Sequence, residues 1–402
     1  MSNIGAGILD KLDRRLFAQP GHPLQMVKAH IAAYFSSLSD NDPACPFPQF
    51  DHFDPIVGVK ENFDDLCFPY THPGRSRSDS YFINNQFLLR THMTANELEF
   101  LKAGKRAFLI AGDVYRRDQI DSTHYPVFHQ LEGVEVFERA NSYNTASSYV
   151  SCDTYAIDTN ALNNISTDES PFKTNHGIDF NWEVQAGQDE RLLRVVTDDL
   201  YQRLTGLMKY LFGPEIPIRW QTCNFPFTCP SFEVEILHRG RWIEVCGSGI
   251  LQQSILQEAS IDSQKNAAWA FGLGLERLAM ILFDIPDIRL FWSQDSRFLG
   301  QFKSLQHRFQ PFSKYPAAWR DLSFWIGKEF GAGAGLKEEF DENGMFDLIR
   351  EIGGDLIEDV SLVRHEIFRI FNINTCRLIS SVKMTQSSHI VIVLLIAHWI
   401  EP

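Results

Sequence analysis

Residues 112–132, GDVYRRDQIDSTHYPVFHQLE, constrain the fold of this chain more than any other segment. An apolar, strand-like run leads into it, a polar connection occupies 116–125, and a second strand pattern follows. The pattern predicts a strand–loop–strand hairpin. In the second strand Phe128, Gln130 and Glu132 share one face, because side chains alternate between the two faces of a strand.

Two arginines, Arg116 and Arg117, open the loop of this predicted hairpin. Their guanidinium groups are planar, permanently charged and suited to phosphate. Together with a ring, an amide and a carboxylate on one strand face, they indicate a site for an anion and a flat ring. A solvated hairpin with a polar face is the competing interpretation.

The composition narrows the class of protein. The chain has 402 residues, 44% of them hydrophobic, which predicts two domains or one large domain with a smaller one. A net charge of −14 argues against non-specific polyanion binding over the whole surface, but a local basic patch stays possible. Seven cysteines without a C-x-x-C pair predict reduced thiols in an intracellular compartment, no zinc site and no disulfide framework. The apolar run at 390–396 is far shorter than the ~20 residues of a membrane helix, so we expect no membrane association.

Periodic patterns place the main elements. Thr94, with Glu97 three residues later, fits a capping box at the start of a helix. Residues 141–190 are rich in Asn, Ser, Thr and Asp and predict a partly disordered surface insertion. The remaining predicted helices cover 23–35, 192–212 and 275–283, and four strand-like runs cover 216–227, 230–239, 241–251 and 268–274. Strand runs joined in this way favour an antiparallel sheet.

A second site signal lies at the passage from the last of these strands into a helix. Gly272 and Gly274 allow close approach of a ligand to the backbone. Arg277 falls in the first helical turn, where a positive charge is unfavourable unless an anion is near. A glycine-lined helix start with a surface arginine is the alternative. The chain has neither a P-loop nor a dinucleotide fingerprint, so phosphate handling would depend on arginines.

Two further features stay ambiguous on residues alone. Phe225 and Phe227 flank a rigid proline, either as the walls of a site or as ordinary aromatic core. Glu244 lies in a strand beside Gly247 and Gly249, as an edge charge or as a metal-binding carboxylate.

Together these segments resemble the mitochondrial, single-chain type of phenylalanine–tRNA ligase, a class II aminoacyl-tRNA synthetase. The likeness runs in register over residues 22–355: residues 112–133 resemble motif 2, 271–292 resemble motif 3, and 224–236 resemble the phenylalanine-pocket segment. It implies an α+β fold, with an antiparallel sheet flanked by helices in a catalytic domain over 1–300. It also implies a ferredoxin-like (βαββαβ) anticodon-binding domain over 309–402.

The resemblance implies ATP and Mg²⁺ as cofactors and a role for each matching residue. Arg116 and Arg277 would be the catalytic residues, on the α- and γ-phosphates, and Phe128 would stack on adenine. Glu244 would contact ATP or Mg²⁺. The implied ATP-binding set is Arg116, Asp118, Thr123, His124, Tyr125, Phe128, Glu244 and Arg277.

On the amino-acid side, the resemblance implies that Gln130 and Glu132 hold the amino group and that Phe225 and Phe227 enclose the ring. The implied phenylalanine-binding set is His92, Thr94, Ala95, Asn96, Glu97, Gln130, Leu131, Glu132, Phe225, Phe227, Gly247, Gly249 and Phe271.

The chain departs from the family pattern at two places. Where the family commonly has His-Thr-Ser-x-x-Gln, residues 92–97 read His-Met-Thr-Ala-Asn-Glu. Glu97 would either take the substrate ammonium or weaken pyrophosphate binding by repulsion. After about Val363 the resemblance ends, so we expect the C-terminal domain to be incomplete, atypical after 363, and its tail to be poorly ordered.

The implied partners are tRNA(Phe) and L-phenylalanine, with a monomeric enzyme in the mitochondrial matrix, although the N-terminus shows no clear presequence. A catalytically idle synthetase-like protein that binds tRNA or a protein partner is the rival from another class. A class II ligase for a different amino acid is the third interpretation. Pyrophosphate exchange with phenylalanine, and then with the other amino acids, discriminates among the three.

Overall fold

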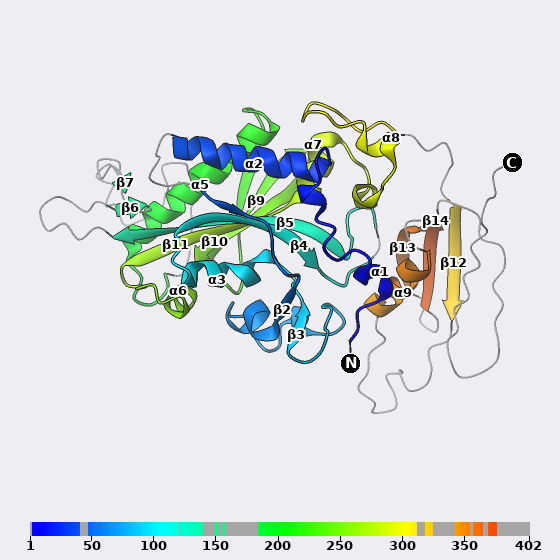
Figure 1. Ribbon diagram of the computed structural model, residues 1–402, viewed down its shortest axis with the longest axis horizontal. Helices are drawn as coiled ribbons and strands as arrows, with labels where there is room; N and C mark the ends of the chain where they lie inside the picture. Colours follow the sequence, from blue (N-terminus) through cyan, green and yellow to red (C-terminus); the bar gives the residue numbers. More distant parts are fainter. Residues whose placement is uncertain are drawn as a thin grey trace, which may run out of the picture.

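The computed structural model describes residues 2–40, 47–119, 121–139, 149–151, 155–156, 184–311, 318–324, 342–353, 357–364 and 369–375. A mixed sheet of nine described strands lies at the centre (Figure 1). Its main path runs β1–β4–β5–β11–β10–β9–β8, with β6 and β7 attached at the end of β5. These strands are β1 Gln49–Phe50, β4 Ala107–Tyr115, β5 Val127–Arg139, β6 Tyr149–Ser151, β7 Tyr155–Ala156, β8 Ile218–Cys223, β9 Thr228–His238, β10 Arg241–Leu251 and β11 Asn266–Gly274.

The predicted antiparallel sheet is confirmed for every pairing of this sheet except one. Strand β1 runs parallel to β4, with Gln49 opposite Leu109 and Phe50 opposite Ile110. Two residues carry no periodic signal, so the sequence alone did not predict this edge strand. A separate antiparallel ribbon joins β2 (Ile56–Gly58) and β3 (Phe87–Leu89).

The hairpin predicted around residues 112–132 is present. β4 and β5 pair antiparallel, with Tyr115 opposite Val127 and Ile110 opposite Glu132, and the loop 116–126 joins them. All nine residues of β4 are buried, because helices or other chain segments cover both faces of the sheet at this strand.

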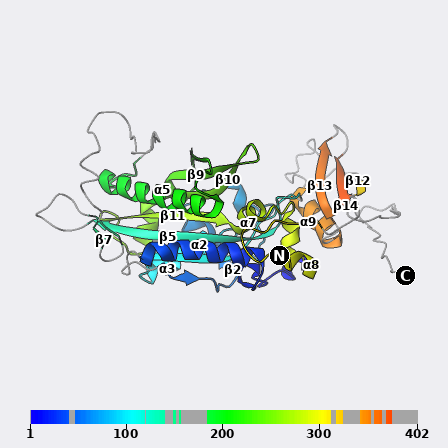
Figure 2. The same cartoon turned by 90° about the horizontal axis from the view of Figure 1, so that it is seen from above.

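Helices cover the two faces of the sheet unequally (Figures 1 and 2). Helices α2, α5 and α7 pack on one face of the sheet and form the larger hydrophobic core with it. Helices α3 and α6 pack on the other face and form a smaller core. The described helices are α1 Ala6–Leu9, α2 Pro23–Asp40, α3 Glu97–Lys102, α5 Glu190–Phe212, α6 Gln253–Glu258, α7 Leu275–Phe283, α8 Ser296–Leu299 and α9 Glu342–Gly353. Shorter turns of helix are η1 Leu16–Ala18, η2 Lys60–Asp64, η3 Pro73–Arg75, η4 Met93–Asn96 and η5 Ile288–Trp292.

The ends of the helices show where local sequence signals predicted the bounds of a helix correctly. Helix α7 has the predicted bounds, and α5 begins two residues earlier than predicted because Asp189 caps it by accepting the backbone N–H groups of Arg191 and Leu192. Helix α2 continues to Asp40, past the predicted end at 35. The predicted capping box at Thr94 is wrong: α3 begins at Glu97, with Asn96 at the N-cap position, and the Thr94 hydroxyl donates to Glu132.

The C-terminal part contains a three-stranded sheet, ordered β12–β14–β13, beside α9 (Figure 1). Its strands are β12 Ala318–Phe324, β13 Ile357–Arg364 and β14 Arg369–Thr375. Strand β14 falls in the segment after 363, where the family pattern ends, and the rest of the tail, 376–402, lies outside the described residues. Most of the predicted insertion at 141–190 also lies outside them.

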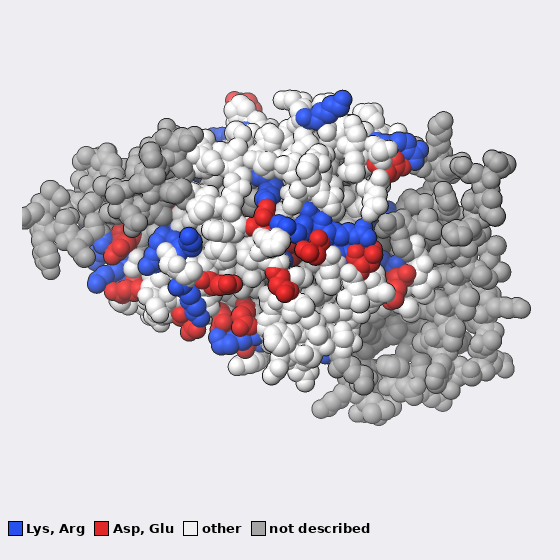
Figure 3. Space-filling model, in the orientation of Figure 1, with Lys and Arg blue, Asp and Glu red and all other residues white. Residues whose placement is uncertain are grey.

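Among the residues that the structure describes, no helix is long and apolar enough to cross a bilayer. On the face drawn in Figure 3, basic and acidic side chains are interleaved across the middle of the molecule. That face therefore presents charges of both signs side by side.

Candidate active site

A cavity of about 930 Å³ opens where β5, β10 and β11 pass the hairpin loop. It lies on the sheet face that α3 and α6 cover, since Phe128 and Phe227 pack against that core as well as line the cavity. Most of the predicted site residues line it together: His92, Thr94, Glu97, Arg116, Asp118, Thr123, His124, Tyr125, Phe128, Gln130, Glu132, Phe225, Phe227, Glu244, Gly247, Phe271 and Arg277.

Two arginines give the cavity a cationic end. Arg116 directly follows β4; its Nε donates to the carbonyl oxygen of Thr91 at 2.8 Å, and its guanidinium lies 5.3 Å from the Phe128 ring centroid. Arg277, in the first turn of α7, donates to the backbone oxygen of Glu244 at 3.1 Å. Its Nη1 is 3.5 Å from the Glu244 carboxylate, and the two side chains are 48% and 45% exposed. Such an exposed pair contributes little stability, so phosphate oxygens can replace the carboxylate at small cost.

The hairpin loop is organised by Asp121, which sequence reasoning missed. Its Oδ1 accepts the backbone N–H groups of Thr123 at 2.6 Å and His124 at 2.7 Å, and its Oδ2 is 2.6 Å from the His124 ring. Burial alone would raise the pKa of Asp121, but these hydrogen bonds lower it below its ordinary value. The hydrogen bond with Asp121 raises the pKa of His124. An aspartate that bonds the backbone two and three residues later is a common turn pattern, so the D-x-T-H text carried a usable signal.

The opposite end of the cavity combines amide, carboxylate and aromatic groups. Gln130 and Glu132 project from β5 as period-2 alternation predicted, and Gln130 Oε1 accepts the Met93 N–H at 3.1 Å. The Thr94 hydroxyl donates to Glu132 at 2.9 Å. The Phe225 and Phe227 rings are nearly parallel, with centroids 5.8 Å apart and 6° between their planes.

His92 faces this end with both ring nitrogens buried, and neither has a hydrogen-bond partner of ordinary geometry among the described residues. Its ring stacks on Phe68, with centroids 5.4 Å apart, and burial lowers its pKa to about 3, so the imidazole is neutral. Buried polar atoms are normally hydrogen-bonded, and an exception in a cavity indicates a group that a ligand would satisfy.

Glycines of the cavity fall into two kinds. A Cβ at Gly247 would lie 3.0 Å from Cζ of Phe225, and one at Gly272 would lie 3.4 Å from Glu132 Oε1. Gly274, in contrast, has no described heavy atom within 4 Å of its Cβ position, and its φ of −78° is open to any residue. Open space at the start of a helix, beside Arg277, suits a bound anion.

Five residues of the implied phenylalanine set lie elsewhere or turn away. Ala95 and Asn96 are not in the lining, and Leu131 points into the opposite core because it alternates with Gln130. A Cβ at Gly249 would lie 2.4 Å from the Pro230 oxygen, so this glycine serves strand packing. Phe271 borders the cavity, but its ring stacks on Phe35 in the core, with centroids 5.3 Å apart.

A buried network of charged side chains joins the hairpin to α7. The sequence did not predict this network. The ring Nδ1 of His129, on β5, pairs with Oε1 of Glu276. The other carboxylate oxygen of Glu276, Oε2, accepts the backbone N–H of His129 at 2.9 Å. The other ring nitrogen is 3.4 Å from Asp113. Arg90 donates to the Asp113 carbonyl oxygen at 2.7 Å. The network ties both strands of the hairpin to α7, although its partners are up to 147 residues apart.

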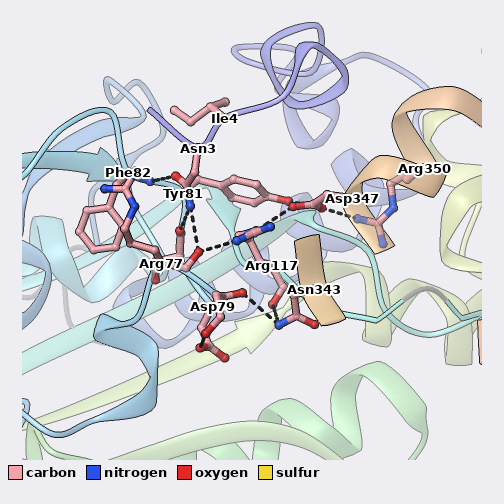
Figure 4. Close-up of polar contacts among 12 residues, drawn as sticks. Asn3, Ile4, Arg77, Asp79, Tyr81, Phe82, Arg117, Asn343, Asp347 and Arg350 are labelled. Carbon is pink, nitrogen blue, oxygen red and sulfur yellow. Dashed lines mark hydrogen bonds and ion pairs between the residues drawn. The ribbon is translucent and has the colours of Figure 1, made fainter. Parts of the chain in front are cut away.

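Helix α9 contacts the same hairpin loop (Figure 4). Asp347 accepts hydrogen bonds from Arg117 Nε and from the Tyr81 hydroxyl, both at 2.8 Å. Asn343 donates to the Ser78 carbonyl oxygen at 3.0 Å. Both Arg116 and Arg117 line the cavity, but Arg117 is engaged by Asp347 of α9.

The residues present fit a nucleotide better than a protein-held metal. The cavity offers two arginines, an aromatic face and an open helix start, which match phosphates and a base. No group of three or more His, Cys, Asp or Glu side chains able to hold a metal exists in the described part of the chain. Mg²⁺ is usually held by one or two carboxylates plus substrate phosphates, so Glu244 alone is compatible with it.

Comparison with known proteins agrees with this geometry. A family model described as tRNA synthetases class II core domain (F) matches residues 16–148 and 192–302. A mouse protein named "Phenylalanine--tRNA ligase, mitochondrial" is 41% identical over 367 residues, covering 90% of this chain and 74% of the relative. Proteins of the same name from Dictyostelium discoideum and Saccharomyces cerevisiae are 39% and 36% identical, again over 90% of this chain and over 78% and 81% of their own lengths.

Proposed function

The chain belongs to the phenylalanine–tRNA ligase family of class II aminoacyl-tRNA synthetases, and from that premise we propose that it activates L-phenylalanine with ATP and charges tRNA(Phe). The observation that carries the proposal is that a single cavity joins Arg116 and Arg277 at one end to carboxyl, amide and aromatic side chains at the other. The mitochondrial names of the relatives support the mitochondrial matrix as its compartment. The idle-protein alternative is not favoured, because the relatives that match most of the chain are named as ligases.

In the first step the phenylalanine carboxylate attacks the α-phosphorus of ATP, a P–O bond forms, and pyrophosphate leaves. Arg116 is placed to stabilise charge on the transferring group and Arg277 to hold the terminal phosphates, as electrostatic preorganisation requires. Mg²⁺, when bound, would neutralise phosphate charge, and Glu244 is the carboxylate that would hold it. In the second step a ribose hydroxyl at the tRNA 3′ end takes the acyl group and AMP leaves.

At the other end Glu132 and Gln130 receive the ammonium group, and Phe225 and Phe227 enclose the benzyl ring. Aromatic rings favour such offset or edge arrangements. An apolar pocket rejects an added hydroxyl by only about 100-fold, so tyrosine is expected to be a measurable poor substrate.

Arg116→Ala in phenylalanine-dependent ATP–pyrophosphate exchange tests the proposal. We expect a loss of about 100-fold or more, because one preorganised donor to transition-state charge contributes at least that much. Arg297→Ala is the matched control, since Arg297 lies in α8, outside the cavity, has a side chain that is 67% exposed, and pairs with Asp295. Near-normal exchange by Arg116→Ala would refute the assigned role, and exchange with an amino acid other than phenylalanine would refute the substrate.

The organisation of the chain belongs to the same proposal. Residues 1–300 form the catalytic domain and 309–402 an anticodon-binding-like domain, which limited proteolysis between them would test. The enzyme acts as a monomer without zinc, which sedimentation and metal analysis of the purified protein would test.

A further inference from the structure

Two buried carboxyl groups, Glu97 and Glu132, lie together at the amine end of the cavity. Glu97 is the first residue of α3 and Glu132 is on β5; they are 2% and 3% exposed. A side-chain hydrogen bond joins them, and the Thr94 hydroxyl donates a second hydrogen bond to Glu132 Oε2 at 2.9 Å. Both line the cavity, so both face a ligand bound there.

Two carboxyl groups in contact and out of water do not both ionise near neutral pH. Burial raises the pKa of Glu97 well above its ordinary value, and the charge of Glu132 raises it further. Burial raises the pKa of Glu132 above its ordinary value, although the hydrogen bonds from Thr94 and Glu97 lower it. Glu97 is thus the group that keeps its proton, and Glu132 is the one that ionises first.

The other charged or titratable groups that face the pair come from three segments. Arg90 and His92 follow β3, Arg116 follows β4, and Cys246 is on β10. Burial lowers the pKa of His92 to about 3 and raises the pKa of the Cys246 thiol, so both are neutral. Arg90 is held by two backbone carbonyl oxygens, and Arg116 is the cation on the cavity side.

We propose that Glu97 is a neutral carboxylic acid that donates a hydrogen bond to Glu132 and so orients the Glu132 carboxylate toward the ammonium group of phenylalanine. This inference rests on the proposed function. The single negative charge of Glu132 balances the single positive charge of the ammonium, and the O–H bond of Glu97 stays intact. Glu97 is then a positioning residue that supplies the donor an amide would supply, and it places no negative charge near pyrophosphate.

A distinctive pH dependence follows. The ammonium group binds the ionised form of Glu132, so the KM for phenylalanine should rise as pH falls through the raised pKa of Glu132, approaching about tenfold per pH unit. The KM for ATP should not follow this curve, because the nucleotide end is served by Arg116 and Arg277.

The test measures KM and kcat for phenylalanine in pyrophosphate exchange between about pH 6 and pH 8, for the wild type, Glu97→Gln and Glu97→Ala. Glu97→Gln, which keeps a donor, should leave KM at about pH 7.5 within about threefold, whereas Glu97→Ala should raise it about tenfold or more with a smaller effect on kcat. Glu99→Gln is the matched control, because Glu99 is exposed on the same helix.

An independent readout is the infrared C=O band of a buried protonated carboxylic acid, recorded without substrate near pH 8. The band should be present in the wild type and absent from Glu97→Gln. The inference would be overturned by a missing band or by a KM that does not change with pH. It would also be overturned if Glu97→Gln raised the KM for phenylalanine tenfold or more, because Glu97 would then be an anionic ligand. If the band is present but phenylalanine supports no exchange, the protonated pair is upheld and the proposed function fails.

Discussion

The buried network of His129, Glu276 and Asp113 makes the sharpest prediction about stability. Glu276→Gln keeps the shape of the side chain but removes one of the negative charges that face a fully buried imidazole. Breaking a buried ion pair by deleting one partner costs about 3–5 kcal/mol. The cost should be lower here, because the amide oxygen still accepts the His129 N–H and the imidazole can release its proton.

The hydrogen bonds of Glu276 set the size of the expected loss in the free energy of unfolding. One hydrogen bond between charged groups contributes about 1.5–3 kcal/mol and a neutral one about 0.5–1.5 kcal/mol. Glu276→Gln exchanges one of the first kind for one of the second, so we expect a loss of about 1 kcal/mol in the free energy of unfolding near pH 6.

The loss should depend on pH in a definite direction. Burial alone would lower the pKa of His129, but Glu276 and Asp113 raise it above its ordinary value. A raised pKa means that the stability from this charge is complete below about pH 6.5 and disappears as pH rises through the folded-state pKa. The difference between the wild type and Glu276→Gln should therefore shrink to about 0.5 kcal/mol or less near pH 9.

Urea denaturation followed by tryptophan fluorescence is the assay, since Trp292 stacks on His129 with centroids 5.7 Å apart. Glu258→Gln is the control: that carboxylate is 49% exposed and pairs with Lys102, so its loss should leave the urea midpoint unchanged. Equal losses for Glu276→Gln at both pH values would show that the imidazole is uncharged and that the reasoning is wrong.

Three further substitutions have definite expected outcomes. Gly133→Ala places a Cβ 2.5 Å from the Phe271 ring and should destabilise the protein by about 1–3 kcal/mol in urea; an unchanged midpoint would mean that the ring moves freely. Gly247→Ala places a Cβ 3.0 Å from the Phe225 ring and should raise the KM for phenylalanine about tenfold without changing that for ATP; a parallel change in both would argue against a ring wall. Asp347→Asn removes a carboxylate that holds the second loop arginine and should cost about 1–3 kcal/mol in thermal or urea unfolding, a value that an unaltered midpoint would contradict.

Elements with strong local periodicity were predictable from the sequence. Strand β10 and helix α7 have the predicted bounds, and the placement of Phe128, Gln130 and Glu132 on one face follows from alternation along β5. The same alternation places Leu131 in the core, which shows that a residue inside a motif need not contact the ligand.

What could not be predicted depends on contacts between distant segments. Thr94 matches a capping box locally, yet its hydroxyl donates to Glu132, 38 residues later, because the turn η4 carries it over β5. The partnership of His129 with Glu276 spans 147 residues and has no local pattern. The protonation of Glu97 likewise depends on which carboxyl group folding brings beside it.

Gly274 has a consequence for experimental design. Neither the backbone angle nor any described atom near the Cβ position requires glycine here, so Gly274→Ala should leave folding unchanged. A methyl group there would occupy part of the cavity, close to the arginine in the first turn of α7. The substitution would thus yield a natively folded protein impaired in nucleotide use alone, in which tRNA binding could be measured without turnover.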